Sequence, residues 1–454
     1  MDKVVADAAT AVQDIPDGAI LGVSGFGASH NFPVDLITAC AERDISDLTL
    51  VCNSLGVSDA HPARLVRAGR VSTLKAAFSA RAAVPNSSAQ DQSPVPIDVE
   101  LIPQGILVER LRAAGAGLGP FYSPVGVDTD VALGKEQRAF NGRDYVLEQP
   151  LPVDYAFVYA SAADRAGNVA FRGSSENLGP SMAKAAKTVI VQVDKIVEVG
   201  ELPIDEIDLP GVFVDRVVLA SETRTPAWRP RRDEAERRQY LGKPGLTPRE
   251  VGSWIADLIP SGSYVNLGVG LPTQVSDFVE GRDIVLHAEN GVLGYSERVD
   301  VDSADPDAYN AGGEPITLGP GSSVFDSVRA FEIARGGHLD AVVLGAFQVD
   351  PEGSFANWTT PAMGGGAIGG AMDLVVDPGR LIIAMRHCER NGRSKIVTEL
   401  DYPVTGKAIV DMIVTDLAVI ERDESGLVLR KAAPGFAAEE ILELTAAPMR
   451  VDLW

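Results

Sequence analysis

The sequence repeats one pattern in its two halves, and this repetition constrains the fold more than any other feature. An Ile-Pro-x-Gly segment that leads into an apolar stretch and a glycine loop occurs at residues 15–27 and again at 259–270. A second pair of segments begins at Asp154 and at Asp340, each with another aspartate ten positions further on and a glycine three residues after that. The apolar residues between the aspartates predict a buried strand, and Asp-x-x-Gly predicts the turn that closes it. The repetition therefore predicts one domain plan used twice.

The length and the charge pattern indicate where the chain divides. A chain of 454 residues is too long for one ordinary hydrophobic core. Residues 221–245 are rich in Arg, Glu and Pro and have almost no apolar periodicity, which is typical of a solvated connection. We expect one domain at about 1–225, a linker at 226–245 and a second domain at 246–454.

Helical and extended stretches alternate in each half. Directly after the linker, Thr247 is a good N-cap, Pro248 suits the first helical position and Glu250 completes a capping box. The clearest other elements are apolar strands at 48–52, 188–193, 283–288 and 380–385 and a helical stretch at 180–187. This alternation predicts an α/β fold with two similar domains, each a largely parallel sheet flanked by helices. In such sheets, ligands bind where the strands end, at the carboxyl edge.

Composition limits the class of partner. The formal net charge of −23 argues against nucleic acid and against an anionic membrane surface, although helix N-termini still allow an anionic small molecule to bind. No apolar run approaches the roughly 20 residues that a membrane span needs. The three cysteines are far apart, and the first 18 residues contain no apolar segment typical of a signal peptide. We therefore expect a protein of the cytoplasm.

The segment VLHAENGVLG, residues 285–294, places the carboxylate of Glu289 between an apolar strand and the pair Asn290-Gly291. Asn-Gly between apolar runs is a strong hairpin signal, which favours a solvated charge beside a tight turn. Because Glu289 directly follows a predicted strand, it also falls at the carboxyl edge of the sheet, where ligands bind. Both interpretations are compatible with this stretch alone.

Other glycine-rich segments give weaker signals. Gly25-x-Gly27 and Gly268-x-Gly270 each lack the third glycine of a dinucleotide-binding motif, although both allow backbone to approach a ligand closely. The cluster at 362–375 is either a flexible loop or a row of backbone N–H groups that face a developing negative charge. The scattered histidines match no metal motif, so no metal is expected.

Gln104 follows a short apolar run and precedes an amphipathic helix. Its amide can cap that helix, or it can donate into a cleft. The sequence pattern does not separate these roles.

Taken together, the motifs resemble those of the family I CoA-transferases of the succinyl-CoA:3-ketoacid and 3-oxoadipate type, with the A and B subunits fused. The resemblance covers nearly the full length. The first-half motifs are PQGILVERLRAAGAG (103–117), FNGRDYVLE (140–148) and ADRAGNVAF (163–171). The second-half motifs are NLGVGLP (266–272), ENGVLG (289–294), NAGGEPIT (310–317), ARGGHLD (334–340), LGAFQVDPEGSFANW (344–358), GGAMDLV (369–375) and YPVTGK (402–407).

The resemblance implies an enzyme that moves CoA from an acyl-CoA to a carboxylic acid, with one of the two acids a 3-oxo acid or a short dicarboxylate. By this similarity Glu289 is the catalytic glutamate, which passes through an anhydride and a glutamyl-CoA thioester. Gln104 and the backbone N–H of Gly370 match the positions that stabilise the oxyanions. No cofactor is implied beyond CoA as a substrate, and a homo-oligomer is expected. An acyl-CoA hydrolase and a non-catalytic acyl-CoA-binding protein remain as alternatives.

The same resemblance places a further set of residues in the substrate- and CoA-binding region. These residues are Gly25, Phe26, Gly27, Asn53, Gly268, Gly270, Asn290, Gly291, Asn357, Gly369 and Lys395. For Lys395 a solvated lysine, and for Asn357 a packing role, are competing interpretations. The chain departs from the family pattern at Ser24, Ser54 and 80–96, so the identity of the acids stays open.

Overall fold

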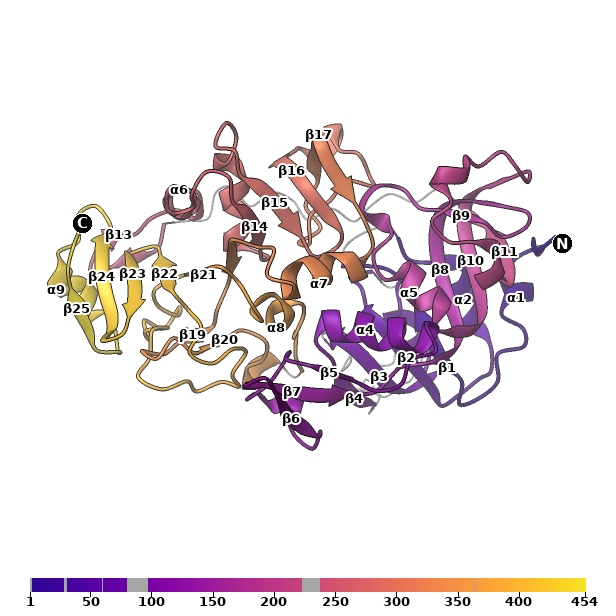
Figure 1. Cartoon of the computed structure of the whole chain (residues 1–454), viewed down its shortest axis with the longest axis horizontal. Helices are drawn as coiled ribbons and strands as arrows, with labels where there is room; N and C mark the ends of the chain where they lie inside the picture. Colours follow the sequence, from indigo (N-terminus) through magenta and orange to yellow (C-terminus); the bar gives the residue numbers. More distant parts are fainter. Residues whose placement is uncertain (1, 28–30, 59, 80–96, 223–236, 364) are drawn as a thin grey trace.

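The computed structural model describes residues 2–27, 31–58, 60–79, 97–222, 237–363 and 365–454. The departing segment 80–96 and most of the predicted linker, 223–236, lie outside the described residues, as does Gly364 of the glycine cluster. Figure 1 shows the first half, from indigo to magenta, beside the second half, from orange to yellow, along the long axis of the molecule.

The first half is built on an eight-stranded sheet with the order β11-β10-β8-β1-β2-β3-β4, in which β9 also pairs with β8. Every neighbouring pair is parallel except β8 and β9. The strands are β1 (Ile20–Val23), β2 (Leu48–Ser54), β3 (Val71–Phe78), β4 (Asp98–Leu101), β8 (Val153–Asp164), β9 (Val169–Ala170), β10 (Ala186–Val197) and β11 (Arg216–Leu219).

The second half is built on a ten-stranded sheet with the order β17-β16-β15-β14-β18-β21-β22-β23-β24-β25. The five strands from β15 to β22 are parallel, whereas antiparallel strands extend the sheet on both sides. The strands are β14 (Tyr264–Leu267), β15 (Val285–Ala288), β16 (Val292–Arg298), β17 (Ile316–Val324), β18 (Ala341–Leu344), β21 (Leu381–Met385), β22 (Met412–Thr415), β23 (Ala418–Asp423), β24 (Gly426–Ala432) and β25 (Met449–Val451). The predicted α/β fold with largely parallel sheets is confirmed, and the antiparallel edges of the second sheet add to it.

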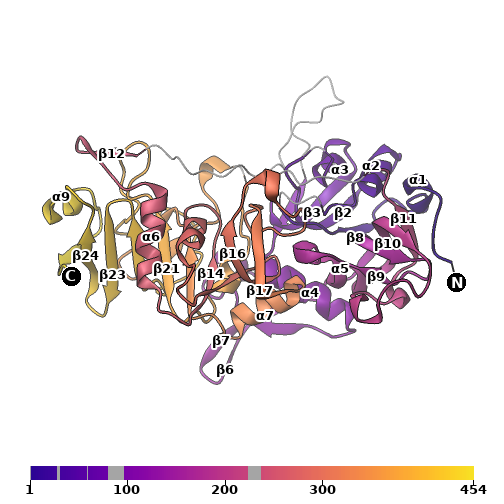
Figure 2. The same cartoon turned by 90° about the horizontal axis from the view of Figure 1, so that it is seen from above.

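Helices cover the sheets and fill the junction between the halves. The α-helices are α1 (Ala8–Ala11), α2 (Val34–Glu42), α3 (Ala63–Arg67), α4 (Gln104–Gly115), α5 (Gly179–Lys184), α6 (Pro248–Leu258), α7 (Ser327–Arg335), α8 (Ala371–Leu374) and α9 (Ala438–Glu443). The 3-10 helices are η1 (Asp130–Ala132), η2 (Gly173–Ser175), η3 (Ile204–Glu206), η4 (Gly211–Phe213), η5 (Leu271–Phe278), η6 (Val301–Ser303) and η7 (Pro361–Met363). In Figure 2, α6 lies over the strands of the second sheet, and it contacts β22. Helix α4 of the first half meets α7 and α8 of the second half at the junction (Figure 1).

Three small sheets complete the architecture. A three-stranded antiparallel sheet, which projects from the lower edge in Figure 1, has the order β5-β7-β6. Its strands are β5 (Phe121–Ser123), β6 (Gln137–Phe140) and β7 (Arg143–Glu148), and the two-stranded sheets are β12 (Gln239–Tyr240) with β13 (Lys243–Pro244) and β19 (Gln348–Val349) with β20 (Phe355–Ala356).

The two halves follow the same plan down to single hydrogen bonds. The strand order β11-β10-β8-β1-β2 of the first sheet reappears as β22-β21-β18-β14-β15 in the second. The repeated aspartates have the same task, because Asp154 accepts the N–H of Ile20 at 2.9 Å and Asp340 accepts that of Tyr264 at 2.8 Å. In both halves a carboxylate thereby fixes the first residue of a neighbouring strand.

The Asp-x-x-Gly turns are duplicated as well. Gly167 donates its N–H to the carbonyl of Asp164 at 3.0 Å, and Gly353 donates to that of Asp350 at 3.1 Å. Both glycines have positive φ, +87° and +83°, a conformation that a side chain disfavours. The predicted repetition is therefore confirmed.

Each half has its own hydrophobic core, and one core continues into the other half. The second half holds one large buried cluster, while the first half holds two. The first-half cluster that contains α4 also includes Ile368 and Met372 of the second half. The two halves therefore share buried apolar surface at the junction.

The described end of the predicted linker packs against the second half. A solvated connection was expected here, but Tyr240 of the β12–β13 hairpin is buried and its hydroxyl donates to Asp416 at 2.8 Å. Lys243 forms an ion pair with Glu440 at 2.6 Å. The expectation of a solvated chain was therefore wrong for Tyr240.

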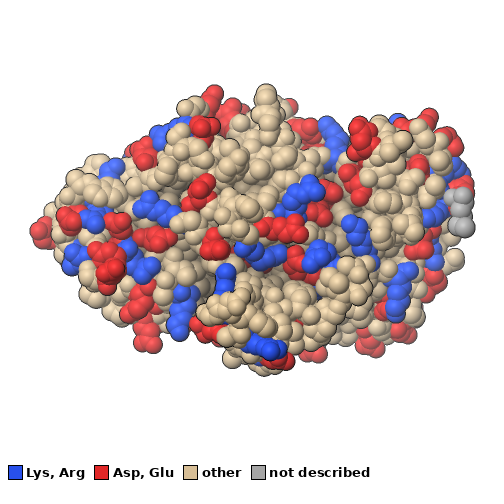
Figure 3. All heavy atoms as spheres, in the orientation of Figure 1, with Lys and Arg blue, Asp and Glu red and all other residues tan. Residues whose placement is uncertain are grey.

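The surface carries charges of both signs. On the face shown in Figure 3, Lys and Arg side chains alternate with Asp and Glu and form no continuous basic patch. No α-helix within the described ranges is long and apolar enough to cross a membrane. The same part of the chain holds no group of three or more His, Cys, Asp or Glu side chains arranged to bind a metal ion.

The capping box at the start of α6 is confirmed and gives a test of the sequence-to-structure argument. The N–H of Glu250 donates to the Thr247 hydroxyl at 3.2 Å, and the N–H of Thr247 donates to the Glu250 carboxylate at 2.7 Å. We expect Thr247→Ala to lower the free energy of unfolding by about 1 kcal/mol, because it removes one acceptor at the helix start. Thr247→Ser should retain most of this stability. Equilibrium denaturation of both variants checks this, and equal losses in the two would contradict it.

Candidate active site

Glu289 occupies a tight turn between two antiparallel strands. β15 ends at Ala288 and β16 begins at Val292, and the N–H of Gly291 closes the turn on the Ala288 carbonyl at 3.0 Å. The hairpin interpretation is therefore correct for the backbone. The Glu289 side chain, however, is only 7% exposed, so the interpretation of a solvated charge is wrong.

The carboxylate of Glu289 shares its pocket with Asn266 and His287. Asn266, on the neighbouring strand β14, hydrogen-bonds to Glu289. The Nδ2 atom of Asn266 lies 2.9 Å from His287 Nδ1 and 3.3 Å from the His287 carbonyl oxygen. Because a carbonyl can only accept, this nitrogen is a donor, which assigns the ring proton of neutral His287 to Nε2. Burial lowers the pKa of His287 to about 4, so the ring stays neutral at neutral pH.

The electrostatics of Glu289 are those of a carboxylate withdrawn from water. Burial raises the pKa of Glu289, and hydrogen bonds from its own backbone N–H and from Asn266 act against that rise. Its Oε2 atom has no hydrogen-bond partner among the described residues. A buried carboxylate oxygen without a partner is costly, so the site is built for an incoming group.

Gln104 and the second glycine pair meet across the junction between the halves. Gln104 is the first residue of α4, but its side chain forms no capping hydrogen bond, so the capping interpretation is wrong. Its backbone N–H donates to the carbonyl of Gly369 at 2.8 Å, and its side chain is fully buried. A Cβ placed on Gly370 would lie 3.4 Å from Gln104 Oε1, so the Gln104 amide is directly beside Gly370.

The segment that carries Gly370 is fixed by strand β3 of the first half. Ala367 bridges to Phe78, and the N–H of Gly369 donates to the carbonyl of Ala77 at 3.2 Å. Gly369 has a φ of +55° and packs on the Phe78 ring. These residues form an ordered segment, so the flexible-loop interpretation is wrong for them.

A set of buried polar atoms has no hydrogen-bond partner in the described parts of the chain. Such atoms mark places where a ligand or water completes the structure. The set includes Gln104 Nε2 and Oε1, Asn266 Oδ1, His287 Nε2, Glu289 Oε2, Asn290 Oδ1, Asn53 Oδ1 and Ser327 Oγ. Four of these residues belong to the Glu289 turn or contact it directly, and Gln104 is the junction residue described above.

Tyr309 connects the Glu289 turn to the first half. Asn290 Nδ2 donates to the Tyr309 carbonyl at 2.9 Å, and the Tyr309 hydroxyl donates to the Ser174 carbonyl at 3.0 Å. Asn31 of the first half donates to the same hydroxyl at 2.6 Å. The turn that presents Glu289 therefore depends on both halves for its position.

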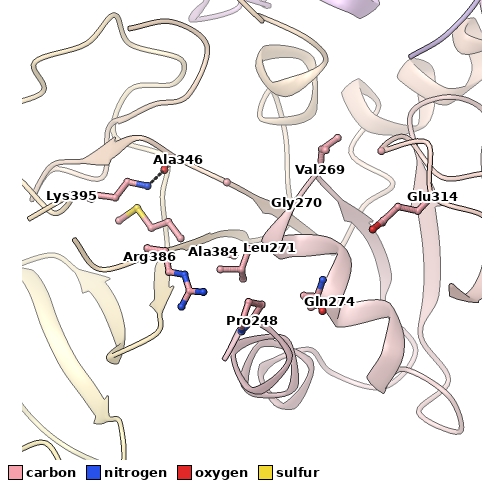
Figure 4. Close-up of a pocket in the computed structure, with 13 residues that line it drawn as sticks. Pro248, Val269, Gly270, Leu271, Gln274, Glu314, Ala346, Ala384, Arg386 and Lys395 are labelled. Carbon is pink, nitrogen blue, oxygen red and sulfur yellow. Dashed lines mark hydrogen bonds between the residues drawn. The ribbon is translucent and has the colours of Figure 1, made fainter. Parts of the chain in front are cut away.

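A cleft of about 680 Å³ opens at the carboxyl ends of β14, β18 and β21 (Figure 4). Its lining residues are Pro248, Val269, Gly270, Leu271, Gln274, Gly312, Glu314, Gly345, Ala346, Ala384, Met385, Arg386 and Lys395. Lys395 and Arg386 lie at one end and Glu314 at the other (Figure 4). Lys395 Nζ donates to the Ala346 carbonyl at 2.5 Å, and burial lowers its pKa to about 8. The interpretation of Lys395 as a solvated lysine is therefore wrong.

The cleft exists because the second half interrupts a strand that is continuous in the first. β8 runs without a break through Tyr159–Ser161, which pair with β10. At the equivalent place, β18 ends at Leu344 and its continuation β19 begins only at Gln348.

The partner strand also differs at this place. The chain takes 13 residues from Ile383 to Ile396, where it takes five from Val191 to Ile196, although the flanking pairings are equivalent. The broken strand and the longer connection together open the cleft.

The expected binding residues are distributed unequally. Gly270 and Lys395 line the cleft, and Gly268 precedes it in tight contact with Leu344. Asn357 does not line it: its side chain donates to the Gly345 carbonyl at 3.1 Å and accepts from Thr405 at 2.8 Å. This is the expected packing role, which fixes the backbone at the cleft.

The first-half residues lie at the carboxyl ends of β1 and β2, away from the lining of this cleft. Gly25 has a φ of +128° and a Cβ there would meet the Phe32 ring at 2.3 Å. Phe26 is buried, Gly27 faces open space, and Asn53 keeps an unpartnered oxygen.

Sequence reasoning missed Asn266 and Arg386 as site residues. Asn266 lies inside a quoted motif, and its signal was the end of the strand that pairs with β15. Arg386 directly follows β21, so its position at a carboxyl edge was the available signal.

Comparison with known proteins gives consistent matches along the whole chain. The sequence matches the Coenzyme A transferase family over residues 5–220 and 250–444. It is 35% identical to human mitochondrial succinyl-CoA:3-ketoacid coenzyme A transferase 2, over 99% of this chain and 90% of that protein. The first half is similar to one of the 3-oxoadipate CoA-transferase subunits of Pseudomonas putida, with 42% identity over 49% of this chain and 95% of that protein. An acyl-CoA transferase of Escherichia coli O157:H7, solved as a thioester complex with CoA, shares the fold with a TM-score of 0.81 at 20% identity, over 100% of this chain and 95% of that one.

The turn that presents Glu289 predicts a strict requirement for Gly291. Its φ is +109°, and a Cβ would lie 1.8 Å from the Phe325 carbonyl oxygen. We expect Gly291→Ala to cost about 2–5 kcal/mol of unfolding free energy, from backbone strain and overpacking together. Gly262→Ala is the matched control, because Gly262 has a φ of +84° with no atom within 4 Å of its Cβ position. Calorimetric melting of both variants checks this, and equal shifts would contradict the role of the Phe325 contact.

Proposed function

The chain belongs to the Coenzyme A transferase family, and we propose that it moves CoA from an acyl-CoA to a carboxylic acid with Glu289 as the nucleophile. The observation that supports this most directly is the buried Glu289 carboxylate, whose Oε2 has no partner among the described residues. A binding protein has no use for a carboxylate of this kind, whereas covalent catalysis requires one.

The proposed reaction divides one transfer into balanced steps. The Glu289 carboxylate attacks the thioester carbonyl, the carbon–sulfur bond breaks, and CoA leaves as a thiolate while an acyl-glutamyl anhydride forms. The thiolate attacks the glutamyl carbonyl, which releases the donor acid as a carboxylate and leaves a glutamyl-CoA thioester. The acceptor carboxylate then passes through the same two steps in reverse. Covalent catalysis replaces one difficult exchange with easier ones.

Each addition step places negative charge on a carbonyl oxygen, which needs donors already in position. The Gln104 amide and the Gly370 N–H are the proposed donors, since the amide lies beside Gly370. Neither Gln104 Nε2 nor the Gly370 N–H is engaged by an acceptor within the described residues. One such donor contributes roughly 2.7–4 kcal/mol to transition-state stabilisation.

The cleft is the proposed site for CoA. Its volume of about 680 Å³ is within the usual range for ligand pockets, and Lys395 and Arg386 supply positive charge at one end. Arg386 is also held by Asp416 at 2.9 Å, which fixes its direction. Binding energy gained by the non-reacting part of CoA can then lower the barrier at Glu289.

For the acids, we propose a 3-oxo acid or a short dicarboxylate, because the relatives act on succinyl-CoA and 3-ketoacids or on 3-oxoadipate according to their names. The departures at Ser24 and Ser54 fall in the first half, near the unpartnered Asn53, so they bear on the acid rather than on CoA. We also propose a homo-oligomer of the cytoplasm. All three cysteines are free and buried, which fits a reducing compartment.

Glu289→Ala tests the nucleophile. We expect mixing of the wild-type protein with succinyl-CoA to leave a CoA adduct on the peptide that contains Glu289. The variant should form none and should lose CoA exchange by on the order of 10⁴-fold or more, because the covalent route is closed. Peptide mass mapping and an exchange assay measure both.

The competing functions give different results in the same experiment. Steady thiol release without an acceptor acid would indicate a hydrolase. Tight CoA binding without any adduct would indicate a binding protein, and either result would contradict the transferase.

The pH dependence tests the burial of Glu289. Since burial raises the folded-state pKa and only the ionised carboxylate attacks, adduct formation should fall as pH drops through a midpoint above the ordinary glutamate range. Asn266→Ala removes a hydrogen bond to the carboxylate and should move this midpoint to still higher pH. Single-turnover rates from pH 4 to 8 check this, with Asn357→Ala as the control. A midpoint near that of a free glutamate would contradict the proposed environment.

A further inference from the structure

We propose that Asp373 and Arg335 are positioning residues that hold Gln104 beside Gly370 across the junction between the two halves. The inference deepens the proposed function, because it rests on Gln104 as an oxyanion donor. It concerns residues that contact no reacting atom and act through the start of α4.

Asp373 of α8 receives donors from both halves. Its Oδ2 accepts the backbone N–H of Gly105 at 2.9 Å, and its Oδ1 accepts from Arg335 Nη1 at 3.1 Å. The side chain is fully buried, and burial raises its pKa to about 6 although Arg335 and Gly105 lower it. Asp373 is therefore ionised at neutral pH, and a buried charge of this kind depends on both donors.

Arg335 carries the contact further along α4. It lies at the end of α7, and its Nη2 atom is 2.7 Å from Glu109 Oε1. The other oxygen of Glu109 accepts from Arg112 Nε at 2.7 Å. One guanidinium thus connects Asp373 of the second half with the second turn of a first-half helix.

The close approach requires glycine at position 105. A Cβ on Gly105 would lie 2.3 Å from Asp373 Oδ1 and 2.5 Å from Arg335 Nη1. The carboxylate also lies at the N-terminus of the twelve-residue helix α4, where the helix dipole favours negative charge. The chain at 104–105 is therefore shaped to receive Asp373.

Gln104 depends on this arrangement because its side chain has no hydrogen bond of its own within the described chain. Its position comes from the backbone, which is held by the bond from the Gln104 N–H to Gly369 and by the bond from Gly105 to Asp373. A donor that stabilises an oxyanion must be in place before the charge develops. Loss of Asp373 or Arg335 would leave the first turn of α4 fixed at one point only.

The test compares Asp373→Asn, Gln104→Ala and the double variant in the full-length protein. We expect Asp373→Asn to lower kcat for CoA exchange by about 10- to 100-fold, the effect of a misplaced catalytic group, with little change in KM. The double variant should be no slower than Gln104→Ala, because both changes remove the same donor. Asp411→Asn is the matched control: Asp411 also accepts a backbone N–H, from Leu381 at 2.7 Å, within the second half.

The outcomes separate positioning from simple stabilisation. If the losses from Asp373→Asn and Gln104→Ala multiply, or if Asp411→Asn lowers kcat equally, the proposal is overturned. Should Asp373→Asn fail to fold, Arg335→Lys takes its place, with the same expected drop in kcat and non-additivity with Gln104→Ala.

Hydrogen exchange of the peptide 104–108 gives a readout independent of activity. We expect faster exchange in Asp373→Asn than in Asp411→Asn. If the wild-type protein forms no Glu289 adduct, the proposed function fails, and this measurement alone decides the present proposal. Unchanged exchange at 104–108 would then overturn it.

Discussion

The burial of the Glu289 carboxylate with one oxygen unpaired is the interaction on which the site depends. In water such a group is a weak nucleophile held by hydration, and burial removes that hydration while raising its pKa. The hydrogen bond from Asn266 limits the rise, and neutral His287 accepts from the same amide. The pocket therefore leaves a carboxylate that can still ionise, with an oxygen that no other group occupies.

Duplication explains the architecture, and a local departure from it explains the cleft. Both halves tie strand starts with an aspartate and close the same turn with Asp-x-x-Gly. The short pair β19–β20 of the second half is the counterpart of the end of β8 with β9. Only the connection between β18 and β19 is irregular, and there Gly345 and Ala346 line the cleft. A packed sheet edge in one half thus becomes a ligand site in the other, through loss of strand pairing over a few residues.

The sequence was sufficient for the features that depend on local pattern. The repeat, the largely parallel sheets, the α6 capping box and the turn at Asn290-Gly291 all follow from spacing and residue type within short segments, and the structure has each of them. Family motifs placed Gln104 and Gly370 in one site, and the two are neighbours. The contact between Gly105 and Asp373 joins residues 268 positions apart, so no local pattern encodes it. The half-buried state of Lys395 likewise depends on the strand break opposite it.

The position of the donors explains why both halves are needed for one site. Gln104 comes from the first half and Gly370 from the second, so their alignment is set at the junction rather than inside either core. That junction combines shared apolar packing, backbone bonds between β3 and the 366–369 segment, and the charged contacts of Asp373 with Arg335. Apolar packing alone is non-directional and tolerates sliding, whereas hydrogen bonds to a buried charge fix both distance and direction. A site that must stabilise charge within a few tenths of an ångström therefore requires the directional contacts, and the buried ion pair is retained at the place where sliding would separate Gln104 from Gly370.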